Sequence, residues 1–128
     1  MATYRAFISF QVEDRWARDF LVGQVKNKNN DLTFTDYSVH EAFGEKWKTN
    51  CKQRIAQTKG TTVLIGPTTA KAEAVLWEIA ETTRQGHPVF GIQIKSDATY
   101  AVPKGLASGS VVRWDIDAII KKLNGWAG

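Results

Sequence analysis

The chain has 128 residues, of which 43% are hydrophobic and 23% are charged, and its formal net charge is +4. A chain of this length and balance can bury an ordinary apolar core as one domain without metals or disulfides, which excludes general disorder. No apolar run approaches the roughly 18 residues of a membrane-spanning helix, so a membrane partner is not expected.

The first residues, the lysines and the single cysteine indicate the localisation and partners to expect. Residues 1–5 lead directly into a predicted strand instead of the apolar region of a signal peptide, so we expect a cytoplasmic protein. The lysines are spread along the chain and are not interleaved with stacking aromatic residues, which argues against nucleic acid as a partner. The single cysteine, Cys51, has no histidine or second cysteine in motif spacing, so we expect a buried apolar side chain and no metal site.

The first half of the chain predicts two strands, each followed by a helix. Residues 4–10 form an aromatic and β-branched strand, and residues 32–35 form a shorter strand near the edge of the sheet. Helices are predicted over residues 13–26 and 45–59. The packed face of the first helix is predicted to consist of Trp16, Ala17, Phe20, Leu21 and Val25.

The second half predicts a strand–helix–strand unit and a closing strand and helix. The run Val63-Leu64-Ile65 ends at Gly66-Pro67, a helix covers residues 73–85, and a second buried strand covers residues 89–94. The stop after the 73–85 helix is set by Gly86 and Pro88. A strand over residues 111–114 precedes a helix capped by Asp115. The predicted packing faces of the two helices are Leu76, Ile79, Ala80 and Thr83, and Ile116, Ile119, Ile120 and Leu123.

Alternating strands and helices of these lengths predict an α/β fold in one domain, residues 1–128. The expected architecture is a doubly wound, flavodoxin-like sheet of five parallel strands in the order 2-1-3-4-5. In such a sheet, ligands bind beyond the carboxyl ends of the strands where the chain order reverses, here between the first and third strands. That rule selects Ser9, Phe10, Asp36 and Thr68, and it places the helix that carries Glu78 next to them.

The sequence leaves two interpretations of Glu78 open. It is either a solvated surface charge or one of the few carboxylates that a ligand at the strand ends could meet. On a helical wheel Glu78 lies roughly 100° from Ile79, on the flank of the predicted packing face, where a glutamate is most often solvated. Glu81, one turn further, is predicted to be a surface charge. His40 and His87 are isolated from any serine or cysteine in motif spacing, so no catalytic triad is expected. A phosphoacceptor receiver is disfavoured because Ser9 and Gly66 stand where that function needs aspartates.

Three segments carry a resemblance to a known family. They are RAFISFQVEDRWAR over residues 5–18, TTVLIGPTT over residues 61–69 and VLWEIAETTRQGHPVFGIQI over residues 75–94. Together these segments resemble the TIR-like family of the bacterial Thoeris antiphage system, of ThsB type, within the TIR superfamily. The similarity spans nearly the whole chain, and the third segment is its most specific part.

The resemblance implies an enzyme that cleaves NAD as its substrate, an NAD+ nucleosidase or ADP-ribosyl cyclase, with no separate cofactor. The family's essential glutamate matches Glu78, and the product would be a cyclic ADP-ribose-type signal that activates a separate effector protein. Phe10 and Trp77 are expected to stack on the nicotinamide or adenine rings. Ser9 and Thr68 are expected to bond ribose or phosphate, and Asp36 completes the substrate-binding set.

Two features leave the functional assignment open. Residues 36–44 lack the arginine-aspartate-proline-glycine type of loop with which many TIR domains assemble, so the geometry of any homo-oligomer is not predicted. The superfamily also contains domains that only scaffold, and a fold does not certify catalysis. The alternative function is therefore a non-catalytic TIR-like module for protein–protein interaction.

Overall fold

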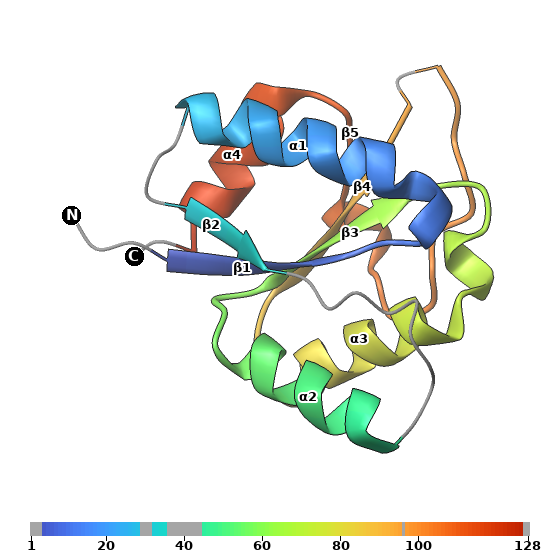
Figure 1. Ribbon diagram of the computed structural model, residues 1–128. Helices are drawn as coiled ribbons and strands as arrows, with labels where there is room; N and C mark the ends of the chain where they lie inside the picture. Colours follow the sequence, from blue (N-terminus) through green and yellow to red (C-terminus); the bar gives the residue numbers. More distant parts are fainter. Residues whose placement is uncertain (1–3, 29–31, 36–44, 96, 127–128) are drawn as a thin grey trace.

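A parallel five-stranded sheet lies between two layers of helices in the computed structural model, which describes residues 4–28, 32–35, 45–95 and 97–126 (Figure 1). The spatial order of the strands is β2-β1-β3-β4-β5 and every neighbouring pair is parallel. This confirms the predicted fold class and strand order, with β2 at the edge. The strands are β1 (Tyr4–Ser9), β2 (Leu32–Thr35), β3 (Thr61–Ile65), β4 (Val89–Gln93) and β5 (Val111–Arg113).

The helices divide into two pairs on opposite faces of the sheet (Figure 1). One pair is α1 (Arg15–Lys28) and α4 (Ile116–Asn124), and the other is α2 (Glu45–Ala56) and α3 (Glu73–Arg84). Short 3-10 turns η1 (Val12–Asp14), η2 (Thr69–Lys71) and η3 (Ser108–Ser110) precede α1, α3 and β5. None of the helices in the described part of the chain is long and apolar enough to cross a membrane.

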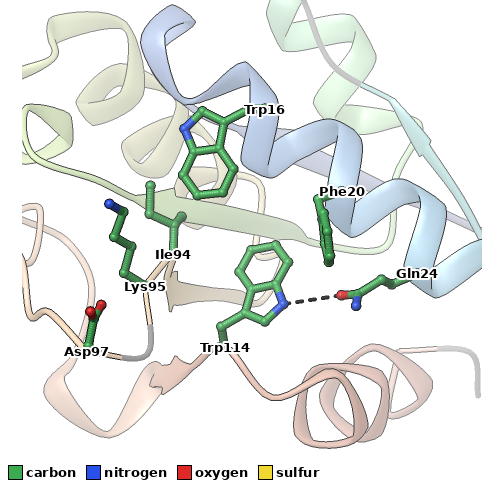
Figure 2. Close-up of a pocket in the computed structure, with 7 residues that line it drawn as sticks. All are labelled: Trp16, Phe20, Gln24, Ile94, Lys95, Asp97 and Trp114. Carbon is green, nitrogen blue, oxygen red and sulfur yellow. Dashed lines mark hydrogen bonds between the residues drawn. The ribbon is translucent and has the colours of Figure 1, made fainter.

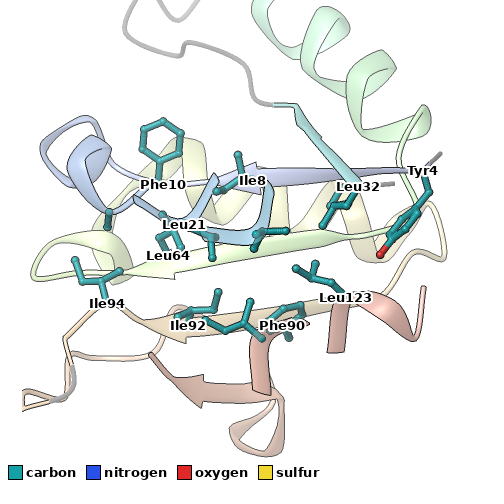
Figure 3. Close-up of a cluster of buried hydrophobic side chains, with 14 residues drawn as sticks. Tyr4, Ile8, Phe10, Leu21, Leu32, Leu64, Phe90, Ile92, Ile94 and Leu123 are labelled. Carbon is teal, nitrogen blue, oxygen red and sulfur yellow. The ribbon is translucent and has the colours of Figure 1, made fainter. Parts of the chain in front are cut away.

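The side chains of β1 alternate between the two faces, as strand geometry requires. Ile8 and Phe10 enter the larger core cluster, which is completed by α1 and α4 residues such as Leu21 and Leu123 (Figure 3). Phe7 points the other way and packs with Cys51 and Ile55 of α2. Ser9 shares the face of Phe7, so the last residue of β1 is directed towards the layer formed by α2 and α3.

The structure confirms two predicted helix ends, the start of α4 at Asp115 and the stop of α3 at Gly86. The Asp115 carboxylate accepts hydrogen bonds from the backbone amides of Asp117 and Ala118, at 3.0 and 3.3 Å, and so caps α4. Helix α3 ends where Gly86 adopts a φ of 79°, a left-handed conformation that favours glycine.

The predicted packing face of the first helix was wrong at two positions. Ala17, Leu21 and Val25 are buried, but Trp16 and Phe20 are 51% and 56% exposed. The buried stripe uses residues four apart, and Trp16 and Phe20 lie one residue, about 100°, to its side. The prediction used hydrophobicity alone and therefore counted two neighbouring stripes as one packing face. One of these stripes faces the core and the other faces outward.

The predicted packing face of α3 was also wrong in part. Ile79 is buried as expected, whereas Ala80 and Thr83 are exposed. The side of the helix that faces the sheet contains two polar residues, Glu78 and Thr82, which an apolar pattern does not register. The fully buried face of α3 is Val75, Glu78, Ile79 and Thr82.

Candidate active site

Glu78 lies inside the protein, in the second turn of α3, with only 1% of its surface exposed. Its Oε1 atom accepts a hydrogen bond from the Ser9 hydroxyl at 2.5 Å, and its Oε2 atom accepts one from the Cys51 thiol at 3.2 Å. The carboxylate thus joins β1, α2 and α3 at the carboxyl end of β1. Of the two interpretations left open by the sequence, the solvated glutamate is excluded.

Ser9 reaches Glu78 because of its place in the sheet. It is the last residue of β1, its register partner is Val63 of β3, and its face of the sheet is covered by α3. The carboxyl ends of β1 and β3 form the point where the chain order reverses, the usual ligand position in a doubly wound sheet. The structure therefore brings two of the predicted site residues, Ser9 and Glu78, together at that point.

A hydroxyl chain fixes α3 against the sheet one turn beyond Glu78. The Thr82 hydroxyl donates to the backbone carbonyl of Glu78 at 2.7 Å, and it also shares a hydrogen bond of 2.7 Å with the hydroxyl of Thr61 on β3. Both threonines are fully buried. Buried polar groups with satisfied hydrogen bonds hold a unique arrangement, so the backbone that carries Glu78 is firmly positioned.

Cys51 is buried as predicted, but no pattern in the sequence indicates its contact with Glu78. Burial raises the pKa of the Cys51 thiol, and the negative charge of Glu78 raises it further. The sulfur therefore stays protonated at neutral pH and keeps its S–H as a donor to the carboxylate. A protonated thiol is a poor nucleophile.

Glu81 is not the surface charge that its spacing predicted, because it is only 7% exposed. Its carboxylate accepts hydrogen bonds from Arg84, at 2.9 and 2.5 Å, and from the side chain of Gln85 at 2.7 Å. The Arg84 guanidinium holds the pKa of Glu81 below its usual value. Helix α3 therefore carries two buried carboxylates, of which Glu81 is paired with a cation on its own helix.

The other predicted site residues do not all gather around Glu78. Trp77 is half-buried and packs against the cluster that contains Cys51. Thr68 is exposed, accepts a hydrogen bond from the Gln11 amide at 3.2 Å and donates one to Glu13. Phe10 is buried in the core cluster on the opposite face of the sheet (Figure 3). Asp36 lies outside the described residues, and the role of each remains a prediction.

Glu78 has almost no exposed surface in this structure. Four surface cavities formed by the described residues are lined by other side chains. A substrate hydroxyl that binds the carboxylate would compete with the Ser9 and Cys51 donors for its two oxygens. Among the described residues, no group of three or more histidine, cysteine, aspartate or glutamate side chains is placed to hold a metal ion.

A third buried carboxylate, that of Asp14, lies near the end of β3. Asp14 is 2% exposed, and within the described residues its Oδ2 atom has no hydrogen-bond partner. A Cβ atom on Gly66 would stand only 2.2 Å from that oxygen, so the carboxyl group occupies the space beside this glycine. Burial and the nearby charge of Glu13 raise the pKa of Asp14 to about 6. Asp14 stands at the start of the helix predicted over residues 13–26, where an acidic side chain is usually solvated, so the sequence does not indicate its burial.

We expect the Asp14→Asn variant to be more stable than the wild type at pH 7.5 by about 1–2 kcal/mol, and equally stable near pH 4. The pKa of Asp14 is raised on folding from 3.8 to about 6, so the folded state binds the extra proton and loses stability as the pH rises through this interval. Urea unfolding of both proteins at several pH values measures the difference. A stabilisation independent of pH would contradict the buried, high-pKa carboxyl.

Comparison with known structures identifies the class of the fold. The chain is similar to the TIR domain of the Toll-related receptor TRR-2 from Hydra magnipapillata, with 17% identity over 98% of this chain and 100% of that one and a TM-score of 0.69. It is also similar to the RPS4 and RRS1 TIR domain heterodimer, with 9% identity, 97% coverage of both chains and a TM-score of 0.61. These identities establish the fold alone, which is that of a TIR domain.

The family follows from the sequence itself. Residues 7–99 match the family model described as Thoeris protein ThsB, TIR-like domain, so the chain belongs to this family. A third solved structure, the TIR domains of the activated Roq1 resistosome, is similar at 16% identity with a TM-score of 0.53, over 70% of this chain and 57% of that one. No curated protein matches the sequence.

Proposed function

We propose that this TIR-like protein cleaves NAD, releases nicotinamide and makes a cyclic ADP-ribose-type signal that activates a separate effector in bacterial antiphage defence. The observation that carries the proposal is the Glu78 carboxylate, which is buried and held by Ser9 and Cys51 at the carboxyl end of β1. Burial of a carboxylate costs free energy that other interactions must compensate. A buried carboxylate at the point where strand order reverses, the usual ligand position, is therefore typical of a functional group.

The chemistry asks for one anionic group. The bond between the ribose C1′ carbon and the nicotinamide nitrogen breaks, and the nitrogen keeps the electron pair, so nicotinamide leaves as a neutral molecule. The ribose becomes an oxocarbenium-like cation, as in glycoside cleavage. A carboxylate that binds the ribose hydroxyls and faces this developing charge stabilises the transition state electrostatically. A hydroxyl or ring nitrogen within the ADP-ribose part then forms the new bond at C1′ and releases a proton to solvent, which closes the cyclic product.

Ser9 and Cys51 have a defined part in this proposal. In the unliganded protein their hydroxyl and thiol hold the carboxylate in one orientation. When the substrate binds, ribose hydroxyls replace one of these donors, while the other keeps the carboxylate aimed at C1′. Both groups are uncharged donors, so neither cancels the negative charge on which the stabilisation depends.

The purified protein incubated with NAD is expected to release nicotinamide and to form a product with the mass of a cyclised ADP-ribose. Liquid chromatography with mass spectrometry follows both species. The assay is repeated with an extract of phage-infected cells, which supplies any infection-dependent activator that the enzyme needs. Nicotinamide release by the Glu78→Gln variant at the wild-type rate would contradict the role given to this residue.

An interaction module without catalysis is the second candidate function. It is supported by the exposed aromatic side chains of Trp16 and Phe20 and by the two structural relatives described as a heterodimer and as a resistosome. The two candidates differ in one result. A module would bind a protein partner equally well as wild type and as Glu78→Gln, and neither form would consume NAD.

A further inference from the structure

A cleft lined by three aromatic rings lies on the face of the sheet opposite Glu78. Its volume is about 450 Å³, within the range of small-molecule sites. Trp16 and Phe20 of α1 form one wall, and Trp114, the residue after β5, forms the other (Figure 2). Ile94, directly after β4, lies between them. We call this cavity the aromatic cleft.

The cleft lies at the edge of the sheet formed by the carboxyl ends of its strands. Ile94 and Trp114 each follow the last residue of a strand, so the cleft opens at the carboxyl ends of β4 and β5. Ligands of doubly wound sheets bind at this edge, usually where the strand order reverses, which here is between β1 and β3, so the cleft is a second position on the same edge. Glu78, by contrast, belongs to α3 and contacts Cys51 of α2, and these two helices cover the other side of the sheet (Figure 1).

One wall of the cleft is held in place before any ligand arrives. The indole nitrogen of Trp114 donates a hydrogen bond to the side-chain oxygen of Gln24 at 3.2 Å, and its ring meets Phe20 edge to face with the centroids 6.0 Å apart. These contacts fix the plane of the Trp114 ring. Trp16 leans over the cleft from the other side, and 51% of its surface is exposed (Figure 2). A flat ring that enters between the indoles would cover apolar surface that now faces water.

The rim of the cleft carries one charge of each sign. Lys95 and Asp97 are exposed and lie on the side of the cleft away from Phe20 and Gln24 (Figure 2). A lysine ammonium is a point charge suited to a phosphate group, and a carboxylate accepts hydrogen bonds from ribose hydroxyls. The aromatic walls and this rim together match the three parts of a nucleotide.

We propose that the aromatic cleft binds a nucleoside monophosphate, with the base between Trp16 and Trp114, the ribose at Asp97 and the phosphate at Lys95. A single phosphate fits better than a chain of phosphates, because the rim offers one lysine and the sequence contains no glycine-rich phosphate loop. The site is separate from Glu78, and the inference does not depend on cleavage of NAD. An apolar protein segment is the competing occupant.

Titration of the ¹⁵N-labelled full chain with adenosine 5′-monophosphate tests the proposal through the indole N–H signals in NMR spectra. The signals of Trp16 and Trp114, assigned with Trp→Phe variants, are expected to shift, and that of Trp77, on the opposite face, is expected to stay. Adenosine, which lacks the phosphate, and ribose 5-phosphate, which lacks the base, should each bind at least about tenfold more weakly than the monophosphate.

Matched variants separate the parts of the site. Trp16→Ala should weaken binding of the monophosphate about tenfold. Lys95→Gln should weaken the monophosphate but not adenosine, whereas Lys59→Gln, which removes an equal charge at the amino end of β3, should change neither. Glu78→Gln should bind like the wild type, so loss of NAD cleavage and loss of this site are distinguishable.

Several results would overturn the inference. It fails if the monophosphate shifts neither indole signal, if ribose 5-phosphate binds as tightly as the monophosphate, or if both lysine variants weaken binding equally. It also fails if Glu78→Gln abolishes binding, since the ligand would then occupy the other site. Association of the protein with itself that Trp16→Ala removes, without nucleotide binding, would assign the cleft to a protein segment instead.

Discussion

The Glu78→Gln variant is expected to release nicotinamide from NAD at least about a hundredfold more slowly than the wild type. Glutamine has nearly the same shape but no negative charge, so it cannot stabilise an oxocarbenium-like ribose. It also presents an amide group to one of the two donors, Ser9 or Cys51, and this mismatch weakens the orientation of the side chain. Initial rates with saturating NAD measure the effect, and circular dichroism checks that the variant is folded.

Glu81→Gln is the matched control for this prediction. Glu81 lies on the same helix and is almost as buried, but its carboxylate is bonded to Arg84 and Gln85. Its loss should lower stability, since Arg84 loses a charged partner, and should leave the rate per folded molecule within a few-fold of the wild type. Equal losses of rate in both variants would mean that a change in α3, and not the charge of Glu78, sets the activity.

Gly66→Ala is expected to destabilise the fold by about 2–3 kcal/mol, towards the upper end of the cost of overpacking a core. The backbone of Gly66 does not have a positive φ, so alanine meets no conformational penalty there. The cost is steric, because the new methyl carbon would stand 2.2 Å from Asp14 Oδ2 and 2.7 Å from the Asp14 carboxyl carbon. Asp14 is buried and its short side chain has little room to turn away. Urea unfolding measures the difference.

The cause of that effect can be isolated by a double-mutant cycle. Asp14→Ala removes the carboxyl group that the methyl would strike, so Gly66→Ala should cost much less in the Asp14→Ala background than in the wild type. An equal cost in both backgrounds would show that the strain arises elsewhere, for example in the hydrogen bond from the Gly66 amide to Thr69.

The fold was predictable because each element has a strong local signal. The apolar run of β3 stops at Gly66 and Pro67, α3 stops at Gly86, and α4 starts at Asp115, and each of these signals works through neighbouring residues alone. The boundaries of β1, β2 and α3 accordingly agree with the prediction to within a residue or two. The strand order then followed from connection rules that hold for any alternating α/β chain.

The site was only partly predictable, because its contacts join residues far apart in the chain. The rule for strand ends selected Ser9 and Glu78, and the two do meet. The thiol of Cys51 reaches Glu78 only because α2 packs beside α3, which no local pattern encodes. The burial of Asp14 and the exposure of Trp16 could not be predicted for the same reason. Asp14 is buried although a charge near a helix start is usually solvated, and Trp16 is exposed although a tryptophan in an apolar stripe is usually buried.

A crystal structure of the complex with a non-cleavable NAD analogue tests the role of Glu78 most directly. The ribose next to the nicotinamide is expected to lie at the carboxyl ends of β1 and β3, with a hydroxyl about 2.6–3.2 Å from the Glu78 carboxylate. One of the two hydrogen bonds from Ser9 and Cys51 should then be broken. An analogue bound elsewhere in the protein, with both of those hydrogen bonds still in place, would contradict that role.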